Sequence, residues 1–126
     1  MKKIISTKGA PEPIGPYNQA VMFGDTLYTS GQIAIDPKNG SLILDTIENE
    51  TKMVMENLKS ILSSAEMSFE NVIKCTIFIA NMKNFSKINK IYAEYFEEKT
   101  APARETVEVS NLPKYVNIEI SLIACK

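Results

Sequence analysis

The clearest chemical signal in the sequence is its only arginine, Arg104. The chain has thirteen lysines beside this one arginine, which follows Pro102 and Ala103 at the expected start of a strand. A guanidinium offers a planar fork of donors that matches the two oxygens of a carboxylate or a phosphate, and an ammonium does not. Arg104 is therefore a candidate clamp for an anionic substrate. A surface arginine, or one held in a structural ion pair, is the alternative.

Glu119 is the second candidate. It lies between Ile118 and Ile120, so in a strand its side chain points to the face opposite theirs. Such a carboxylate needs solvent or a partner, because burying an unpaired charge is costly. It could act as a general base or orient a water molecule, while a solvated sheet face or a lysine partner is the alternative. If the strands of Arg104 and Glu119 were neighbours, both groups would share one cleft.

Three further places carry weaker signals. Tyr17 follows a Gly-Pro loop that would position its hydroxyl, and Ser30-Gly31 offers a hydroxyl beside an unhindered backbone N–H. Asn89 is polar in a stretch otherwise flanked by apolar residues. Turn chemistry and packing explain the first two equally well, and a solvated helix position explains Asn89.

The composition excludes several classes of site. The 126 residues are 44% hydrophobic and carry a net charge of −1, which predicts a single globular domain over residues 1–126. Without histidine, a zinc site of the usual type and any Ser-His or Cys-His pair are excluded. The balanced charge disfavours nucleic acid as a partner. No apolar run is long enough for a membrane span. Because Cys75 and Cys125 form no CxxC pair and the first residues lack a signal-peptide pattern, we expect a reduced, cytoplasmic protein.

The hydrophobic periodicity predicts the elements that position these residues. Three prolines and two glycines make residues 7–16 an ordered loop. Strands are predicted at 20–23 and 27–29 around a Gly24-Asp25 turn, with the strand resuming at 33–35 before a turn at 36–40. The elements expected after that turn are a helix at 47–65, a strand at 72–80, a helix at 85–97, and strands at 104–109 and 116–124.

This order predicts an α+β fold, in which a single mixed β-sheet carries two helices on one face. The second face of the sheet is of mixed character. It is too polar for a core and too apolar for free solvent, which mildly favours self-association. Its expected residues are Lys74, Thr76 and Phe78 on one strand and Asn117, Glu119, Ser121 and Ile123 on another.

Taken together, six short motifs occur in an order and at spacings typical of one family. They are Ile14-Gly15-Pro16-Tyr17, Thr29-Ser30-Gly31-Gln32, Pro102-Ala103-Arg104, Val107-Glu108-Val109, Leu112-Pro113-Lys114 and Ile118-Glu119-Ile120. On these motifs the chain closely resembles the reactive intermediate deaminase A family (RidA, also called YjgF), over essentially its whole length.

The resemblance implies a chorismate-mutase-like fold and a homotrimer with three clefts at the subunit interfaces. It also implies hydrolysis of 2-imino acids, the tautomers of 2-aminoacrylate and 2-aminocrotonate, to 2-oxo acids and ammonia without a cofactor. By position, Arg104 would bind the substrate carboxylate, and Glu119 would position the attacking water. The other cleft residues implied, some of them from the neighbouring subunit, are Tyr17, Ser30, Gly31 and Asn89, with backbone contacts from Thr106.

Three positions depart from the family pattern. Glu105 follows the arginine where a small residue is usual. Strand alternation points it away from Arg104, whereas a twisted backbone would let it compete for the guanidinium. Ala101 replaces an aromatic residue often found before Pro-Ala-Arg, and this change alters the wall of the cleft. Thr106 replaces a cysteine seen in some members, which a backbone role tolerates.

Other functions compete with the deaminase. A sensor of small carboxylates such as 2-oxo acids would use the same cleft and Arg104 without turnover. An endoribonuclease or translation inhibitor, activities attributed to some family members, fits poorly with a near-neutral chain that has one arginine and no histidine. A structural scaffold would be indifferent to Arg104.

Overall fold

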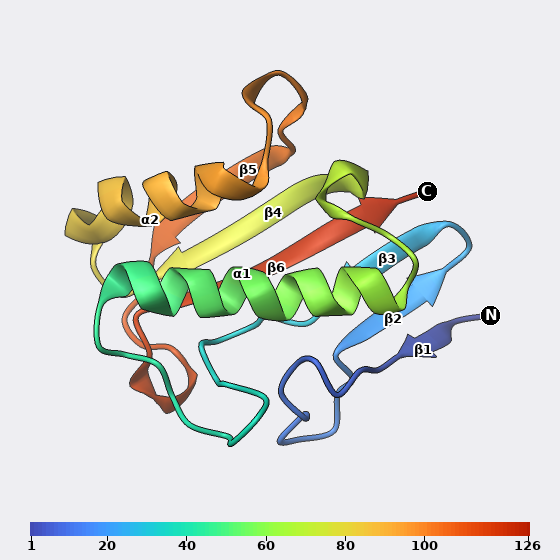
Figure 1. Cartoon of the computed structure of the whole chain (residues 1–126), viewed down its shortest axis with the longest axis horizontal. Helices are drawn as coiled ribbons and strands as arrows, with labels where there is room; N and C mark the ends of the chain where they lie inside the picture. Colours follow the sequence, from blue (N-terminus) through green and yellow to red (C-terminus); the bar gives the residue numbers. More distant parts are fainter.

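Six strands form one mixed sheet, and both helices cover the same face of it (Figure 1). The computed structural model describes all residues, 1–126, and it confirms the predicted α+β class. The strand order is β1-β2-β3-β6-β4-β5, and every neighbouring pair is antiparallel except β4 and β5. The elements are β1 (Lys3–Ile5), β2 (Ala20–Phe23), β3 (Thr26–Thr29), α1 (Ile47–Ser64), β4 (Val72–Ile79), α2 (Phe85–Tyr92), β5 (Ala103–Glu108) and β6 (Ile118–Cys125).

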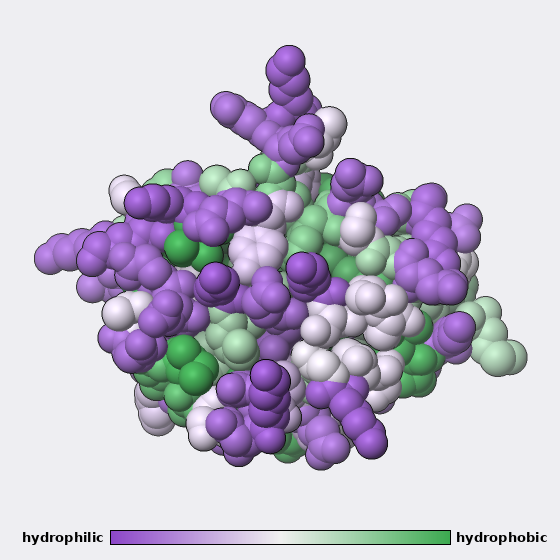
Figure 2. Space-filling model, in the orientation of Figure 1, coloured by the Kyte–Doolittle hydropathy of each residue, from purple (hydrophilic) through white to green (hydrophobic).

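The core lies between the sheet and α1. The apolar stripe of this helix is fully buried, and it packs on the inward side chains of β4 and β6. The helix begins at a Thr46 cap, whose side chain accepts a hydrogen bond from the backbone N–H of Asn49 at 3.0 Å. The outer surface of the helices is largely hydrophilic, as Figure 2 shows. The stripe predicted from the sequence is therefore the face that holds α1 on the sheet.

A buried carboxylate joins α1 to the start of β6. Glu50 is completely buried, and its side chain accepts hydrogen bonds from the backbone N–H groups of Asn117 and Ile118 at 2.7 and 3.2 Å. The side-chain amide of Asn117 donates a third bond at 2.8 Å. Since β6 carries Glu119, this contact fixes the end of the strand from which that side chain projects.

The structure corrects three expectations. Lys3–Ile5 is a strand that the short apolar run did not reveal. Residues 33–35 are not a strand, because Gln32 and Ile35 make only isolated bridges, to Ile120 and Leu42. The second helix ends at Tyr92 rather than at residue 97, and short 3-10 turns follow it. These turns bring Tyr95 and Phe96 against Phe69, with ring centroids 5.2 Å apart in both pairs.

The second face of the sheet carries no helix (Figure 1). Its side chains are partly exposed in one copy of the chain, and Tyr28 and Val107 are 50% and 42% exposed. Apolar and polar residues alternate there without a cover from the chain itself. The prediction that this face associates with another copy follows from that pattern and stays a prediction.

Candidate active site

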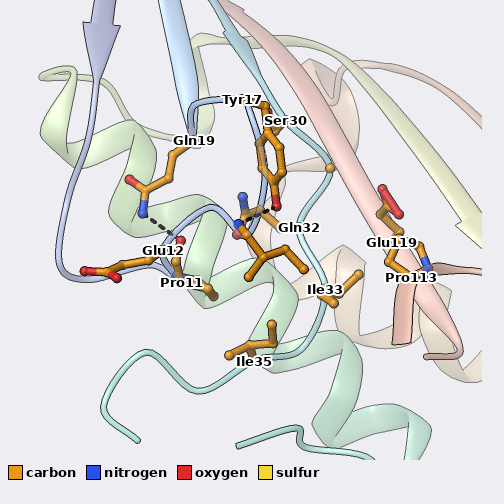
Figure 3. Close-up of a pocket in the computed structure, with 12 residues that line it drawn as sticks. Pro11, Glu12, Tyr17, Gln19, Ser30, Gln32, Ile33, Ile35, Pro113 and Glu119 are labelled. Carbon is orange, nitrogen blue, oxygen red and sulfur yellow. Dashed lines mark hydrogen bonds between the residues drawn. The ribbon is translucent and has the colours of Figure 1, made fainter. Parts of the chain in front are cut away.

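A cavity of about 330 Å³ opens beside the 11–19 loop, next to the start of β6 (Figure 3). Four of the residues singled out in the sequence line it, namely Tyr17, Ser30, Gly31 and Glu119. The apolar part of the wall consists of Pro11, Ile14, Ile33, Ile35 and Pro113. The cavity therefore combines a carboxylate and hydroxyl groups with an apolar lining, as small-molecule sites do.

Glu119 and Gly31 are in direct contact. The 30–32 segment is pinned to β6, because Gln32 and Ile120 exchange backbone hydrogen bonds of 2.8 and 3.1 Å. This places the Cα of Gly31 under the Glu119 side chain, and a Cβ at position 31 would collide with its carboxylate. The glycine is needed here for the close approach of the side chain, and not for an unusual backbone conformation.

The carboxylate of Glu119 has no hydrogen bond and no ion pair within the chain. The two ion pairs of the protein are Lys74–Glu105 and Lys126–Glu66, so the lysine partner considered from the sequence is absent. Burial raises the pKa of Glu119 above its ordinary value. A half-buried, unpaired carboxylate with a raised pKa is suited to exchange a proton with a bound water.

Gln19 and Ser30 hold the loop that forms the far wall of the cavity. The buried amide of Gln19 accepts a bond from the N–H of Thr7 at 2.7 Å and donates to the carbonyls of Thr7 and Ala10. It also donates to the carbonyl of Pro11, as Figure 3 shows. The Ser30 hydroxyl donates to the carbonyl of Asn18 at 2.6 Å. The proton of Ser30 is thus engaged in holding the loop. No feature of the sequence pointed to Gln19, since a glutamine before a strand is common on surfaces.

Arg104 lies in a separate cluster, on the helix-covered face of β5. Its Nη1 donates to Oδ1 of Asn89 at 2.7 Å. Its guanidinium carbon lies 4.8 Å from the ring centroid of Tyr92 and 5.7 Å from that of Phe85. No carboxylate of the chain pairs with Arg104, so the structural ion pair considered as an alternative is absent, and its remaining donors have no partner within the chain.

Arg104 and Glu119 do not share a cleft within one chain. Their strands are not neighbours, because β4 lies between β5 and β6. In β4, Cys75 is opposite Arg104 and Phe78 is opposite Glu119. Residues three apart in a strand face opposite sides of the sheet, so the two groups lie on different faces. The condition for a cleft shared within a single chain is therefore not met.

A comparison with known families shows the family of the whole chain. A family model described as Endoribonuclease L-PSP, the YjgF/RidA family, matches residues 7–126. The chain belongs to the RidA family.

RidA-family relatives cover the chain from end to end. A RutC family protein of Pyrococcus horikoshii is 51% identical over all of this chain and 99% of its own length. The mouse protein named 2-iminobutanoate/2-iminopropanoate deaminase is 42% identical over 98% of this chain and 91% of its own. Among solved structures, E. coli TdcF with bound serine is 40% identical with a TM-score of 0.93, and the two chains are each covered to 98%.

Two of the positions at which this RidA chain departs from the pattern, Glu105 and Thr106, form no hydrogen bond with Arg104. Glu105 points away from it, as strand alternation predicted, and pairs with Lys74 Nζ at 2.8 Å and the Thr76 hydroxyl at 3.0 Å. The hydrogen bond from Lys74, and to a smaller extent the one from Thr76, lowers the pKa of Glu105. Thr106 lies on the Arg104 face, where its hydroxyl is buried without a partner.

The structure also bears on the state of the cysteines, on metal binding and on membrane insertion. Cys75 is buried, and this burial raises the pKa of its thiol, so it packs as a neutral side chain rather than as a thiolate. Nowhere do three or more cysteine or carboxylate side chains gather as metal ligands would. Neither helix is long and apolar enough to cross a membrane.

Proposed function

We propose that this chain hydrolyses 2-imino acids to 2-oxo acids and ammonia, without a cofactor, in clefts between copies of the chain in a homotrimer. The observation that carries the proposal is the pair of complementary clusters. In one cluster, the guanidinium of Arg104 is bonded to Asn89 and keeps unpaired donors. In the other, the unpaired carboxylate of Glu119 lies beside an apolar cavity. Mammalian relatives named as deaminases of this class support the choice of substrate.

A second copy is needed to unite the clusters, because one chain keeps them on opposite faces of its sheet. A neighbour would bring the Arg104 side of its β5 to the cavity that Tyr17 and Glu119 line. Three copies arranged in a closed ring would form three equal clefts. Each cleft would take its Arg104 cluster from one copy and its Glu119 cavity from the next. The uncovered second face of the sheet supplies apolar area for such contacts.

In the proposed reaction the substrate already carries an electrophilic carbon, so the protein has mainly to position the reactants. The fork of Arg104 binds the carboxylate with two parallel hydrogen bonds and fixes the plane of the imine. Glu119 takes a proton from a water molecule as the water oxygen bonds to the imine carbon, and it passes this proton to the imine nitrogen, which gives a carbinolamine. Glu119 then takes the hydroxyl proton of the carbinolamine and delivers it to the nitrogen as the carbon–nitrogen bond breaks, so that ammonia leaves and the carbonyl of the 2-oxo acid remains.

A binding protein without turnover is the second candidate. The structure of TdcF holds serine, whose α-carboxylate is the group that Arg104 is proposed to bind. A carboxylate clamp alone would serve a sensor of 2-oxo acids equally well, because a fold and a site do not guarantee chemistry. Under this alternative, Glu119 would have no role in a reaction.

A coupled assay separates the two. A pyridoxal-phosphate-dependent threonine dehydratase generates 2-iminobutanoate in the cuvette, and the formation of 2-oxobutanoate is followed with and without this protein. The proposal predicts that the wild type accelerates this step and that Arg104→Ala and Glu119→Gln do not. If the wild type binds 2-oxobutanoate through Arg104 without accelerating the step, the sensor is the better account.

A further inference from the structure

The geometry points to a positioning role for α2: the ring of Tyr92, assisted by that of Phe85, fixes the plane in which the Arg104 guanidinium meets its ligand. Phe85, Asn89 and Tyr92 follow one another at intervals of four and three residues, so they form one stripe along the helix. This stripe is the part of α2 that touches Arg104. The inference rests on the proposed carboxylate clamp and concerns how that clamp is held.

The three contacts restrain different motions of the guanidinium. Asn89 accepts a hydrogen bond from Nη1 at 2.7 Å, which restrains that end of the fork. A single hydrogen bond leaves the guanidinium plane free to rotate about the axis of that bond. The Tyr92 ring lies 4.8 Å from Cζ and the Phe85 ring lies 5.7 Å from it, and cations are attracted to such ring faces. Together the amide and the rings restrain both the direction and the plane of the fork.

Arg104 needs such support because little else in the chain restrains it. It lies on β5, the edge strand of the sheet, and it has no ion pair. A long side chain at such a place has many rotamers, and binding a carboxylate bidentately would freeze them. Rings that order the side chain in advance reduce this entropic loss and favour tight binding.

The ring of Tyr92, rather than its hydroxyl, performs this task. Tyr92 is only 6% exposed, and its hydroxyl is buried beside the thiol of Cys75 without a hydrogen bond of ordinary geometry. A hydroxyl left in this way does not stabilise the fold, whereas the ring supplies the surface near Arg104. Phenylalanine at this position therefore keeps the positioning contact, and leucine removes it.

Because the chain has a single arginine, the mobility of the Arg104 side chain can be measured directly. A ¹⁵N–¹H spectrum of the chain contains one arginine Nε–H signal, from Arg104. The rigidity of this group can therefore be measured without assigning other residues. We expect a rigid Nε–H by its heteronuclear relaxation in the wild type and in Tyr92→Phe, and a mobile one in Tyr92→Leu. Phe85→Ala serves as a second probe that the fold tolerates, because Phe85 is 37% exposed. Ile91→Ala truncates the same helix outside the stripe, and it should leave the signal rigid.

Kinetics in the coupled assay give the second readout. A loosened clamp weakens the carboxylate contact in the ground and transition states alike, so Tyr92→Leu should raise KM about tenfold with little change in kcat. Tyr92→Phe should restore most of this loss. A purely structural role would instead lower kcat through loss of folded protein, with KM unchanged.

A mobile Nε–H in the wild type would overturn the inference. A rigid one in both Tyr92→Leu and Phe85→Ala, or a fall in kcat alone, would overturn it too. The spectra need no substrate, so a wild type that fails to hydrolyse imines would refute the proposed function without affecting this test.

Discussion

Arg104 and Glu119 lie on opposite faces of one sheet, with β4 between their strands. Neither residue is paired with an opposite charge, and each belongs to its own cluster. The two clusters are complementary, since a guanidinium and a carboxylate with a raised pKa are what binding and hydrolysing an imino acid would use. The proposed account therefore depends on the neighbouring copy as much as on the chain itself.

Arg104→Lys should abolish most of the deaminase activity while the fold persists. Lysine keeps the charge but lacks the fork, so one of two parallel hydrogen bonds to the substrate carboxylate is lost. A hydrogen bond to a charged group contributes about 1.5–3 kcal/mol, which predicts a fall in kcat/KM of about tenfold to a hundredfold. The coupled assay measures it, with circular dichroism as the control for folding. Turnover close to that of the wild type would contradict the carboxylate clamp.

Glu119→Gln should remove activity and at the same time stabilise the fold at neutral pH. Burial raises the pKa of Glu119, so the folded state favours its protonated form. Its contribution to stability is therefore full below the unfolded pKa and is lost as pH rises through the raised folded pKa. Thermal unfolding at pH 5 and pH 8 should show a larger gain in Tm from the substitution at the higher pH.

The raised pKa of Glu119 also predicts where kcat falls at acid pH. If the ionised Glu119 takes the proton from water, kcat should fall with decreasing pH at a point above the ordinary pKa of a glutamate. The profile of kcat against pH from 4 to 8 measures this. An acid limb that persists unchanged in a partly active Glu119 variant would assign it to another group.

Gly31→Ala should impair activity more than stability. The added Cβ collides with the carboxylate of Glu119, which must turn away from the cavity. We expect kcat to fall at least about tenfold, as happens when a group that handles protons loses its position. Gly24→Ala is the matched control. Position 24 has a positive φ and open space around it, so its cost is about 1 kcal/mol of stability without loss of activity.

Glu50→Ala should destabilise the fold by about 3 kcal/mol or more, because it leaves one buried and two partly buried donors at the start of β6 without an acceptor. Urea unfolding measures the change. Glu48→Ala, in the same first turn of α1, loses only a favourable interaction with the helix dipole, worth a few tenths of a kcal/mol. Equal effects of the two substitutions would show that the Glu50 contacts contribute little.

The sequence predicted much of the fold because long elements have strong periodicity. The α1 stripe and the alternation of β4 and β6 follow directly from the spacing of their apolar residues. Lys3–Ile5 escaped notice because a three-residue strand has no period to detect. The helix predicted at 85–97 is too long, because Tyr95 and Phe96 continue its apolar stripe although they pack on Phe69 from the 3-10 turns after Tyr92.

The sequence singled out residues that the structure places in two clusters, but it did not predict their arrangement. Tyr17, Ser30, Gly31 and Glu119 do meet at one cavity. The distance between Arg104 and that cavity depends on strand order, which places β4 between β5 and β6, and spacing along the chain carries no information on that order. Gln19 and Glu50 went unnoticed for a related reason, since their partners lie on backbone segments distant in sequence.

The most direct test of the account mixes two inactive variants. Arg104→Ala and Glu119→Gln chains are unfolded together in equal amounts, refolded, and tested in the coupled assay. If each cleft takes its guanidinium from one copy and its carboxylate from the next, every mixed trimer regains one intact cleft, and about a quarter of the wild-type activity should return. If both groups of a cleft came from the same copy, mixing would restore nothing, and an absence of recovery would contradict the account.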